Sequence, residues 1–193
     1  MINISKIEEF ADKLFSSLSN DLTYHNRKHT SDVRAAAKRL GELEKLSEKE
    51  MKLLDIAALF HDIGHVETYE GHEDVSKNFI VSNAECFGLE NEDTSLIVSM
   101  IEATKLPQNP ENHLSMILCD ADLDNLGRDD FLDVFEKIFI ETQKYGPVLS
   151  KHEWCFQTIK MMKNHSYFTL SAKKLRYDMK IKNIKLLEDM LNE

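Results

Sequence analysis

Two groups of residues in the middle of this sequence have side chains that can bind metal ions or transfer protons. One group is rich in histidine and the other in aspartate: His25, His29, His61, His65 and His72, then Asp120, Asp122 and Asp124. Imidazole and carboxylate groups are common ligands of transition metals, and histidine also exchanges protons near neutral pH. The two groups therefore predict a metal site, a proton-transfer site, or both.

The pair His61-Asp62 directly follows an apolar segment, residues 57–60, that is expected to be a buried helix. Burying an imidazole and a carboxylate is costly unless they are paired or bind a cation. Neighbouring helical side chains point about 100° apart, so both reach one ion only where the helix ends. We expect the helix to end at this pair, with Gly64 as its stop. The alternative is a core histidine bonded to a backbone carbonyl and a helix-capping aspartate.

Four segments, in this order along the chain, resemble motifs of cyclic-nucleotide phosphodiesterases. The first matches Tyr-His-Asn, two residues, His, then Asp-Val; the second matches Ala-Ala-x-Phe-His-Asp-x-x-His. The third is Ala-Thr, followed here by Lys instead of Asp, and the fourth is similar to Cys-Ala-Asp-Leu-Ser-Asn. These segments are residues 24–33, 57–65, 103–105 and 119–125. The order His, His-Asp, Asp is typical of the HD superfamily of metal-dependent phosphohydrolases, which the chain resembles over about residues 24–125.

The resemblance implies a metal site that holds one or two divalent ions, of Mn, Mg, Fe, Zn, Co or Ni. The implied ligands are His29, His61, Asp62 and Asp122, and Asp62 would bridge two ions. Asp120 is the rival of Asp122. Two residues apart on a helix, the two carboxylates point about 200° apart, so only one of them faces the metal. Asp124 is expected to face solvent or to cap the next turn.

The resemblance also implies roles for residues around the metal. His25 would protonate the leaving oxygen, and His65 would hold a water molecule or join a second metal. The alternatives are a surface loop histidine for His25 and a helix-end cation for His65. His72 is a further candidate for the second metal. Arg27 and Lys105 would bind the phosphate of the substrate, and Lys28 and Arg128 are other cations that could.

These residues indicate hydrolysis of a nucleotide-like phosphomonoester or phosphodiester by a water molecule that a metal ion activates. Two alternatives stay open. The first is a di-iron oxygenase on the same scaffold, with further histidine ligands. The second is a non-catalytic module that binds a nucleotide and regulates a partner. Gln157 is a candidate for clamping a purine by its position alone, and Trp154 is expected in the core rather than stacked on a base.

Composition narrows the class of protein further. The chain has 193 residues and is expected to form a single domain over residues 1–193. Its net charge of −10 disfavours binding to a nucleic-acid polymer, which needs lysine and arginine against phosphates. The three cysteines lack the spacing of a disulfide framework or a zinc site. There is no secretory signal and no membrane span, so we expect a cytoplasmic protein whose partner is a small phosphorylated substrate.

Glycine and proline are scarce, and nearly every segment repeats its apolar residues with helical spacing. The expected fold is all-α, a single HD-domain-like bundle of about eight or nine helices. Ser47 to Glu50 reads as a capping box, and Pro110 as the first turn of a helix. The basic last helix is expected to be a solvated face. The expected helices are residues 3–18, 30–43, 47–60, 73–87, 92–105, 110–123, 129–145, 148–164 and 170–191.

Overall fold

The structure is a computed structural model that describes residues 2–192, and all regular secondary structure in this part of the chain is helical, without strands. The expected all-α fold is confirmed, with nine α-helices and two short 3-10 helices in the described residues. The elements are α1 (Ile4–Phe15), α2 (Arg27–Leu43), α3 (Glu48–Phe60), η1 (Ile63–Val66), α4 (His72–Phe87), α5 (Asn91–Thr104), α6 (His113–Asp122), η2 (Asp124–Gly127), α7 (Phe131–Tyr145), α8 (Lys151–Asn164) and α9 (Leu170–Asn192).

Local sequence determines where several helices begin. At the start of α3, the Ser47 hydroxyl accepts from the Glu50 backbone and the Glu50 carboxylate accepts from the Ser47 backbone, which confirms the expected capping box. Ser150 and Glu153 form a second capping box at the start of α8. The expected start of α6 at Pro110 is wrong. The Asn112 side chain accepts from a backbone N–H inside α6, so this helix begins at residue 113.

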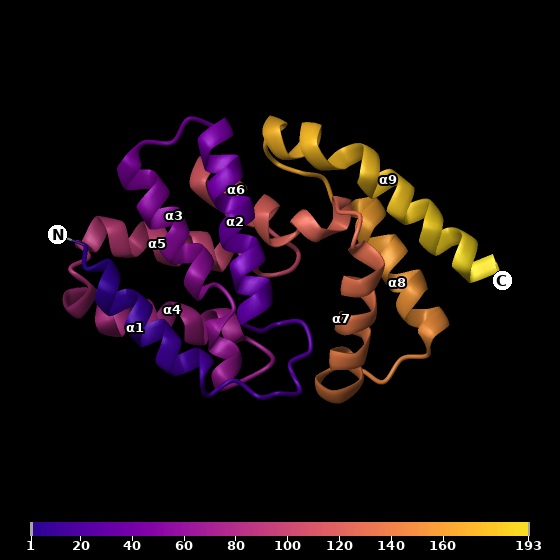
Figure 1. The fold of residues 1–193 in the computed structure, drawn as a ribbon, viewed down its shortest axis with the longest axis horizontal. Helices are drawn as coiled ribbons and strands as arrows, with labels where there is room; N and C mark the ends of the chain where they lie inside the picture. The colour runs from indigo at the N-terminus through magenta and orange to yellow at the C-terminus, as the bar shows by residue number, and fades with distance from the viewer. Residues whose placement is uncertain (1, 193) are drawn as a thin grey trace.

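Two hydrophobic clusters hold the helices together. The larger cluster is built mainly from α1 to α6 and also includes Ile63 of η1 and, near the start of α9, Tyr167 and Ala172. The smaller cluster is built from η2, α7, α8 and α9. Figure 1 shows α1 to α6 on one side of the molecule and α7 to α9 on the other, with η2 between them in the chain. Helix α9 packs against α8 and η2. The residues that close α6 and open η2 therefore lie where the two groups of helices meet.

A network of buried charges links these groups at η2. The Asp124 carboxylate is 5% exposed and accepts hydrogen bonds from Arg39 of α2 at 2.8 Å and from Arg176 of α9 at 2.7 and 2.8 Å. The expectation that Asp124 faces solvent or caps a turn is therefore wrong. The expected solvated face of α9 also fails at Arg176 and at Lys180, which is 3% exposed and donates to the His165 carbonyl. Helical periodicity alone does not show that these charged side chains have partners inside the fold.

The three cysteines are free thiols, as expected. No helix within residues 2–192 combines the length and the apolarity that crossing a membrane requires. The single-domain organisation remains a prediction.

Candidate metal centre

The end of helix α3 brings His61 and Asp62 to the middle of the molecule. The helix ends at Phe60, so the expected break at this pair is confirmed. Gly64 is not the stop, because it lies inside η1 without a left-handed backbone. It allows a close contact instead. A Cβ atom on Gly64 would lie 1.9 Å from the carbonyl oxygen of His72, at the start of α4. The glycine thus lets α4 approach the His-Asp turn.

Four side chains from three helical segments direct one donor atom each to a common point. The Nε2 atom of His29 lies 3.2 Å from Nε2 of His61, 3.2 Å from Oδ2 of Asp62 and 3.4 Å from Oδ1 of Asp122. The Nε2 atom of His61 lies 3.2 Å from the same Asp62 oxygen and 3.5 Å from the same Asp122 oxygen. All four side chains are at least four-fifths buried, with exposures of 4%, 0%, 10% and 17% in chain order.

These separations fit a divalent cation. Ligands at the usual zinc distances in a tetrahedral site are about 3.3 Å from one another. Five of the six donor pairs in this cluster are 3.2–3.5 Å apart. The Asp62 Oδ2 atom is also buried without a hydrogen-bond partner in the described residues. An orphaned carboxylate oxygen between two imidazoles is unfavourable unless a cation is present.

The electrostatics of the cluster agree with this fit. Burial alone would raise the pKa of Asp62, but the neighbouring histidines outweigh it and hold this pKa well below its usual value. For Asp122, burial also acts upward, yet His29 and His61 lower its pKa to about 2. The pKa of His61 is raised well above its usual value, because the two carboxylates outweigh the effect of burial. Two ionised carboxylates thus attract positive charge to this point, and a metal ion can replace protons there.

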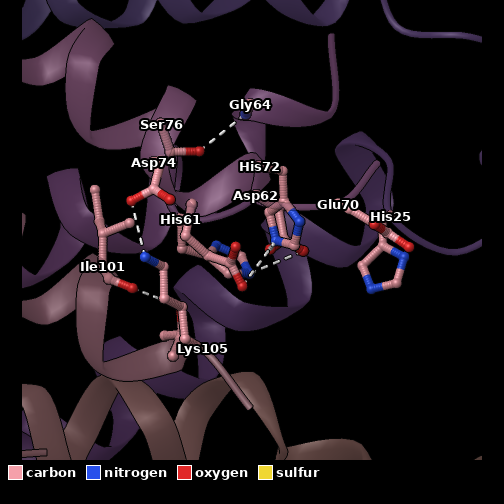
Figure 2. Close-up of polar contacts among 12 residues, drawn as sticks. His25, His61, Asp62, Gly64, Glu70, His72, Asp74, Ser76, Ile101 and Lys105 are labelled. Atoms are coloured by element: carbon pink, nitrogen blue, oxygen red, sulfur yellow. Dashed lines mark hydrogen bonds and ion pairs between the residues drawn. The ribbon is translucent and has the colours of Figure 1, made fainter. Parts of the chain in front are cut away.

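A second group of donors shares Asp62. Ligand atoms of His25, Asp62 and His65 lie within 4.8 Å of one another. His72 places Nε2 3.1 Å from Oδ1 of Asp62, the contact visible in Figure 2. The His65 ring stacks on the His72 ring with centroids 3.8 Å apart, and neither His65 nitrogen has a hydrogen-bond partner in the described residues. Burial lowers the pKa of His65 to about 3, so its ring is neutral and can act as a ligand.

Glu141 of α7 contacts His25 and was not predicted from the sequence. One Glu141 oxygen meets the Nδ1 atom of His25, and the other accepts from the backbone N–H groups of Tyr24 and His25 at 2.8 and 3.1 Å. Glu141 is fully buried. A signal was present, because the apolar stripe of this helix, Phe131 to Ile138 at helical spacing, continues onto Glu141. An acid on a buried stripe usually has a partner.

A cavity of about 220 Å³ opens beside these residues. At one end it is lined by Tyr24, His25, Asp62, His72 and Asp122. The other walls are largely apolar and come from η2, α7 and α8. Trp154 lines this cavity and packs on the Phe135 and Phe139 rings with centroids 6.0 and 6.2 Å apart, so it belongs both to the second core and to the cavity wall.

Other predicted site residues lie outside this cavity. Lys105 pairs with Asp74 at 2.8 Å, as Figure 2 shows, and with Glu102 at 3.0 Å. Arg27 pairs with Asp12 at 2.7 Å. Like these two, the other cations Lys28 and Arg128 are absent from the cavity lining; Lys28 pairs with Asp32, and Arg128 with Asp32 and Asp130. Gln157 is exposed on α8 and is also absent from the cavity lining.

Asp120 points away from the histidines, as its position two residues before Asp122 predicts. Its carboxylate accepts from the backbone N–H groups of Phe168 and Thr169 at 2.8 Å and from the Thr169 hydroxyl at 2.7 Å. These contacts lie directly before α9. The structure thus separates the two carboxylates, one beside the histidines and one at a helix start.

The sequence model of the HD domain matches residues 26–124, about half of the chain, and the chain belongs to this family. The HD motif that names the family corresponds to His61-Asp62 in this sequence. Proteins with this domain are generally metal-dependent phosphohydrolases. A search of curated proteins and a search of solved structures each found no significant match.

Proposed function

We propose that this protein is a metal-dependent phosphohydrolase that cleaves a small organic phosphomonoester or phosphodiester. The observation that carries the proposal is the cluster of His29, His61, Asp62 and Asp122, whose donor atoms lie 3.2–3.5 Å apart in every measured pair. These four side chains would hold the ion. The neighbouring His65 and His72 supply donors for a second ion that shares Asp62.

A divalent ion, when bound, lowers the pKa of water and screens the negative charge of a phosphate. The residues of the chain provide the rest of the chemistry. The Glu141 carboxylate accepts from Nδ1 of His25, which orients the ring. His25 lines the cavity, so as the imidazolium it can donate the proton on Nε2 to the leaving oxygen of the ester. The buried walls around Asp62 and Asp122 limit access of bulk water.

The nucleotide-like substrate expected from the sequence is one candidate among these organic phosphates. The cavity is lined by the proposed metal ligands Asp62 and Asp122 and by the proposed acid His25, so an ester bound in it would contact both. No lysine or arginine lines the cavity in the described residues, so metal ions would have to neutralise the phosphate. This need supports a reaction that depends strictly on added metal.

The test is metal content by elemental mass spectrometry, measured on the wild type and on Asp62→Ala, together with a Mn²⁺-supplemented screen of phosphomonoesters and phosphodiesters. We expect one or two ions per wild-type chain, their loss in the variant, and release of phosphate or of a phosphomonoester by the wild type only. Glu67→Ala, at an exposed carboxylate near the same turn, is the matched control and should behave as wild type. Two bound irons without hydrolysis would favour the oxygenase alternative, and neither metal nor turnover would leave a binding module.

A further inference from the structure

The cavity beside the candidate metal centre has two chemically different ends. Asp62, Asp122, His25 and His72 form the polar end. Six apolar or aromatic side chains from η2, α7 and α8 form its apolar end: Leu126, Phe131, Phe135, Ile138, Trp154 and Met161. A phosphate ester bound at the polar end would therefore direct its organic group toward the apolar end.

The apolar end is formed by side chains that are themselves largely buried. Phe131 and Phe135 are 2% and 1% exposed, and their rings belong to the second hydrophobic cluster together with the partly buried Trp154. The walls come from α7 and α8, outside the segment that matches the HD domain. The HD-domain match therefore does not define this end of the cavity.

The size of the cavity limits the organic group. About 220 Å³ is below the roughly 300–1,000 Å³ of pockets that enclose drug-sized ligands. An engineered apolar cavity of about 150 Å³ binds benzene. The space is thus sufficient for a phosphoryl group and one ring or a short branched chain. Gln157, the one residue considered for clamping a purine, is exposed elsewhere on α8.

The charges around the cavity limit the organic group of the ligand further. Its charged lining within the described residues consists of three carboxylates, Asp62, Glu73 and Asp122, and lacks lysine and arginine. An organic group with its own negative charge would be repelled, and so would a polyphosphate chain beyond reach of the ions. Two polar atoms in this lining, Nε1 of Trp154 and Oδ1 of Asn125, are buried without a partner. They leave room for one acceptor and one donor on the ligand.

From these observations we propose that the substrate is a phosphate ester of a compact, uncharged, apolar or aromatic alcohol, with its organic group between Phe131, Phe135 and Trp154. The proposal rests on the phosphohydrolase function and narrows its substrate class. Hydrolysis of such an ester breaks the bond between phosphorus and the alcohol oxygen, adds the oxygen of water to phosphorus, and returns one proton to the alcohol.

Trp154 is the only tryptophan of the chain, so its fluorescence reports directly on this cavity. The probes are phenylphosphonate and methylphosphonate, which share a non-hydrolysable phosphoryl group and differ in the ring. With Mn²⁺ present, we expect phenylphosphonate to bind at least tenfold more tightly and to change the Trp154 emission, because the ring is removed from water. Equal affinities without an emission change, or tighter competing binding by adenosine monophosphate, would overturn the proposal.

Thr158→Phe tests the location of the ring. Thr158 is a buried residue of α8 that lines the cavity, and a phenyl side chain there occupies its apolar end. We expect the variant to lose the preference for phenylphosphonate and to keep its metal content and its affinity for methylphosphonate. Gln157→Phe, one residue away and exposed, is the matched control and should keep the preference. If Thr158→Phe does not fold, Ile138→Phe on α7 fills the same cavity.

Benzyl alcohol separates the failure of this proposal from failure of the proposed function. It has the ring without the phosphoryl group, so its binding does not depend on a metal. If the protein binds no metal and hydrolyses nothing, yet benzyl alcohol changes the Trp154 emission in wild type and not in Thr158→Phe, the phosphohydrolase function fails and the apolar site stands. Conversely, if the protein hydrolyses nucleotides and shows no preference for compact esters, the phosphohydrolase function stands and the proposed substrate class fails.

Discussion

The buried carboxylate of Glu141 contacts the imidazole of His25, although 116 residues separate them in the chain. Burial alone would raise the pKa of the Glu141 carboxyl, but the hydrogen bonds from His25 and from two backbone N–H groups outweigh it and lower this pKa. The carboxylate is thus ionised and accepts from Nδ1. Because Nδ1 of His25 is occupied by this contact, Nε2 is the ring nitrogen that takes part in the proposed reaction.

Glu141→Gln should slow turnover through its effect on His25. The amide keeps the shape and one acceptor oxygen, but it lacks the negative charge that holds and orients the imidazole. General acid catalysis contributes about 10²–10⁴-fold, so we expect a loss within that range for an alkyl ester. The loss should fall on kcat rather than on KM, since Glu141 itself does not line the cavity.

A nitrophenyl ester provides the control, because its leaving group needs little protonation. Glu141→Gln and His25→Asn should both act much more weakly on this ester than on an alkyl ester, and the double variant should be no worse than the worse single one. An equal loss on both esters would indicate that Glu141 serves folding only.

Adding metal should stabilise the fold. The ion binds the native arrangement of His29, His61, Asp62 and Asp122 and stabilises it by about 2.7 kcal/mol at one hundred times its Kd. For a chain of this size, that corresponds to a rise in Tm of roughly 5–10 °C. Calorimetry with and without Mn²⁺ measures the shift. Asp122→Asn should abolish it, whereas Glu67→Ala should leave it intact, and a full shift in Asp122→Asn would exclude Asp122 as a ligand.

Asp120→Ala should destabilise the protein without removing the metal. The variant leaves the buried N–H of Thr169 and its neighbour at the start of α9 without their acceptor. We expect a loss of about 2–4 kcal/mol in the free energy of unfolding, measured in urea. Metal content should stay at the wild-type level. Loss of metal from the folded variant would contradict the separation of Asp120 from Asp122.

Lys105→Ala and Arg27→Ala should change KM less than about twofold, because each cation is paired outside the cavity and exposed ion pairs contribute little. The short motifs favoured both residues as phosphate ligands. Steady-state kinetics on the best ester of the screen decides the matter. A tenfold rise in KM for either variant would return that residue to the substrate site.

His165 should make stability depend on pH below neutrality. Burial, with the charge of nearby Lys180, lowers the pKa of His165 to about 4 in the folded protein, below its ordinary value near 6.5. As pH falls, His165 therefore takes up a proton in the unfolded chain before it does so in the folded protein. The contribution of neutral His165 to stability is complete above about pH 6.5 and is lost as pH falls toward 4. Urea titrations at pH 7 and pH 4.5 should show a steeper decline for wild type than for His165→Gln, by roughly 2 kcal/mol.

Local signals in the sequence predicted much of this structure. Residues that cap helices, such as Ser47, act on backbone groups only a few positions away, so short-range spacing is enough to find them. The break after Phe60 follows from the same kind of reasoning. The approach of His29, His61, Asp62 and Asp122 was foreseen from their order in the chain, because a family resemblance carries spatial information that periodicity lacks.

Residues whose partners lie far away were missed. The sequence predicts that Asp124 faces solvent or caps a turn, whereas Arg39 and Arg176 contact its buried carboxylate. The position of Glu141 on the apolar stripe of α7 indicates that it has a buried partner, but no local pattern identifies His25 as that partner. Lys105 follows the Ala-Thr motif, but its ammonium group pairs with Asp74 of the neighbouring α4. In each case the outcome depends on which helices pack together, and the pattern of one helix does not determine that.

The late position of α7 and α8 in the chain has a consequence for biosynthesis. His29, His61, Asp62 and Asp122 all precede Glu141 and Trp154, so they are synthesised first. A nascent chain that has emerged only as far as η2 would already contain the four proposed ligands, but neither the carboxylate that orients His25 nor the apolar wall of the cavity. On the ribosome, the capacity to bind an ion would thus come before the capacity to select an ester.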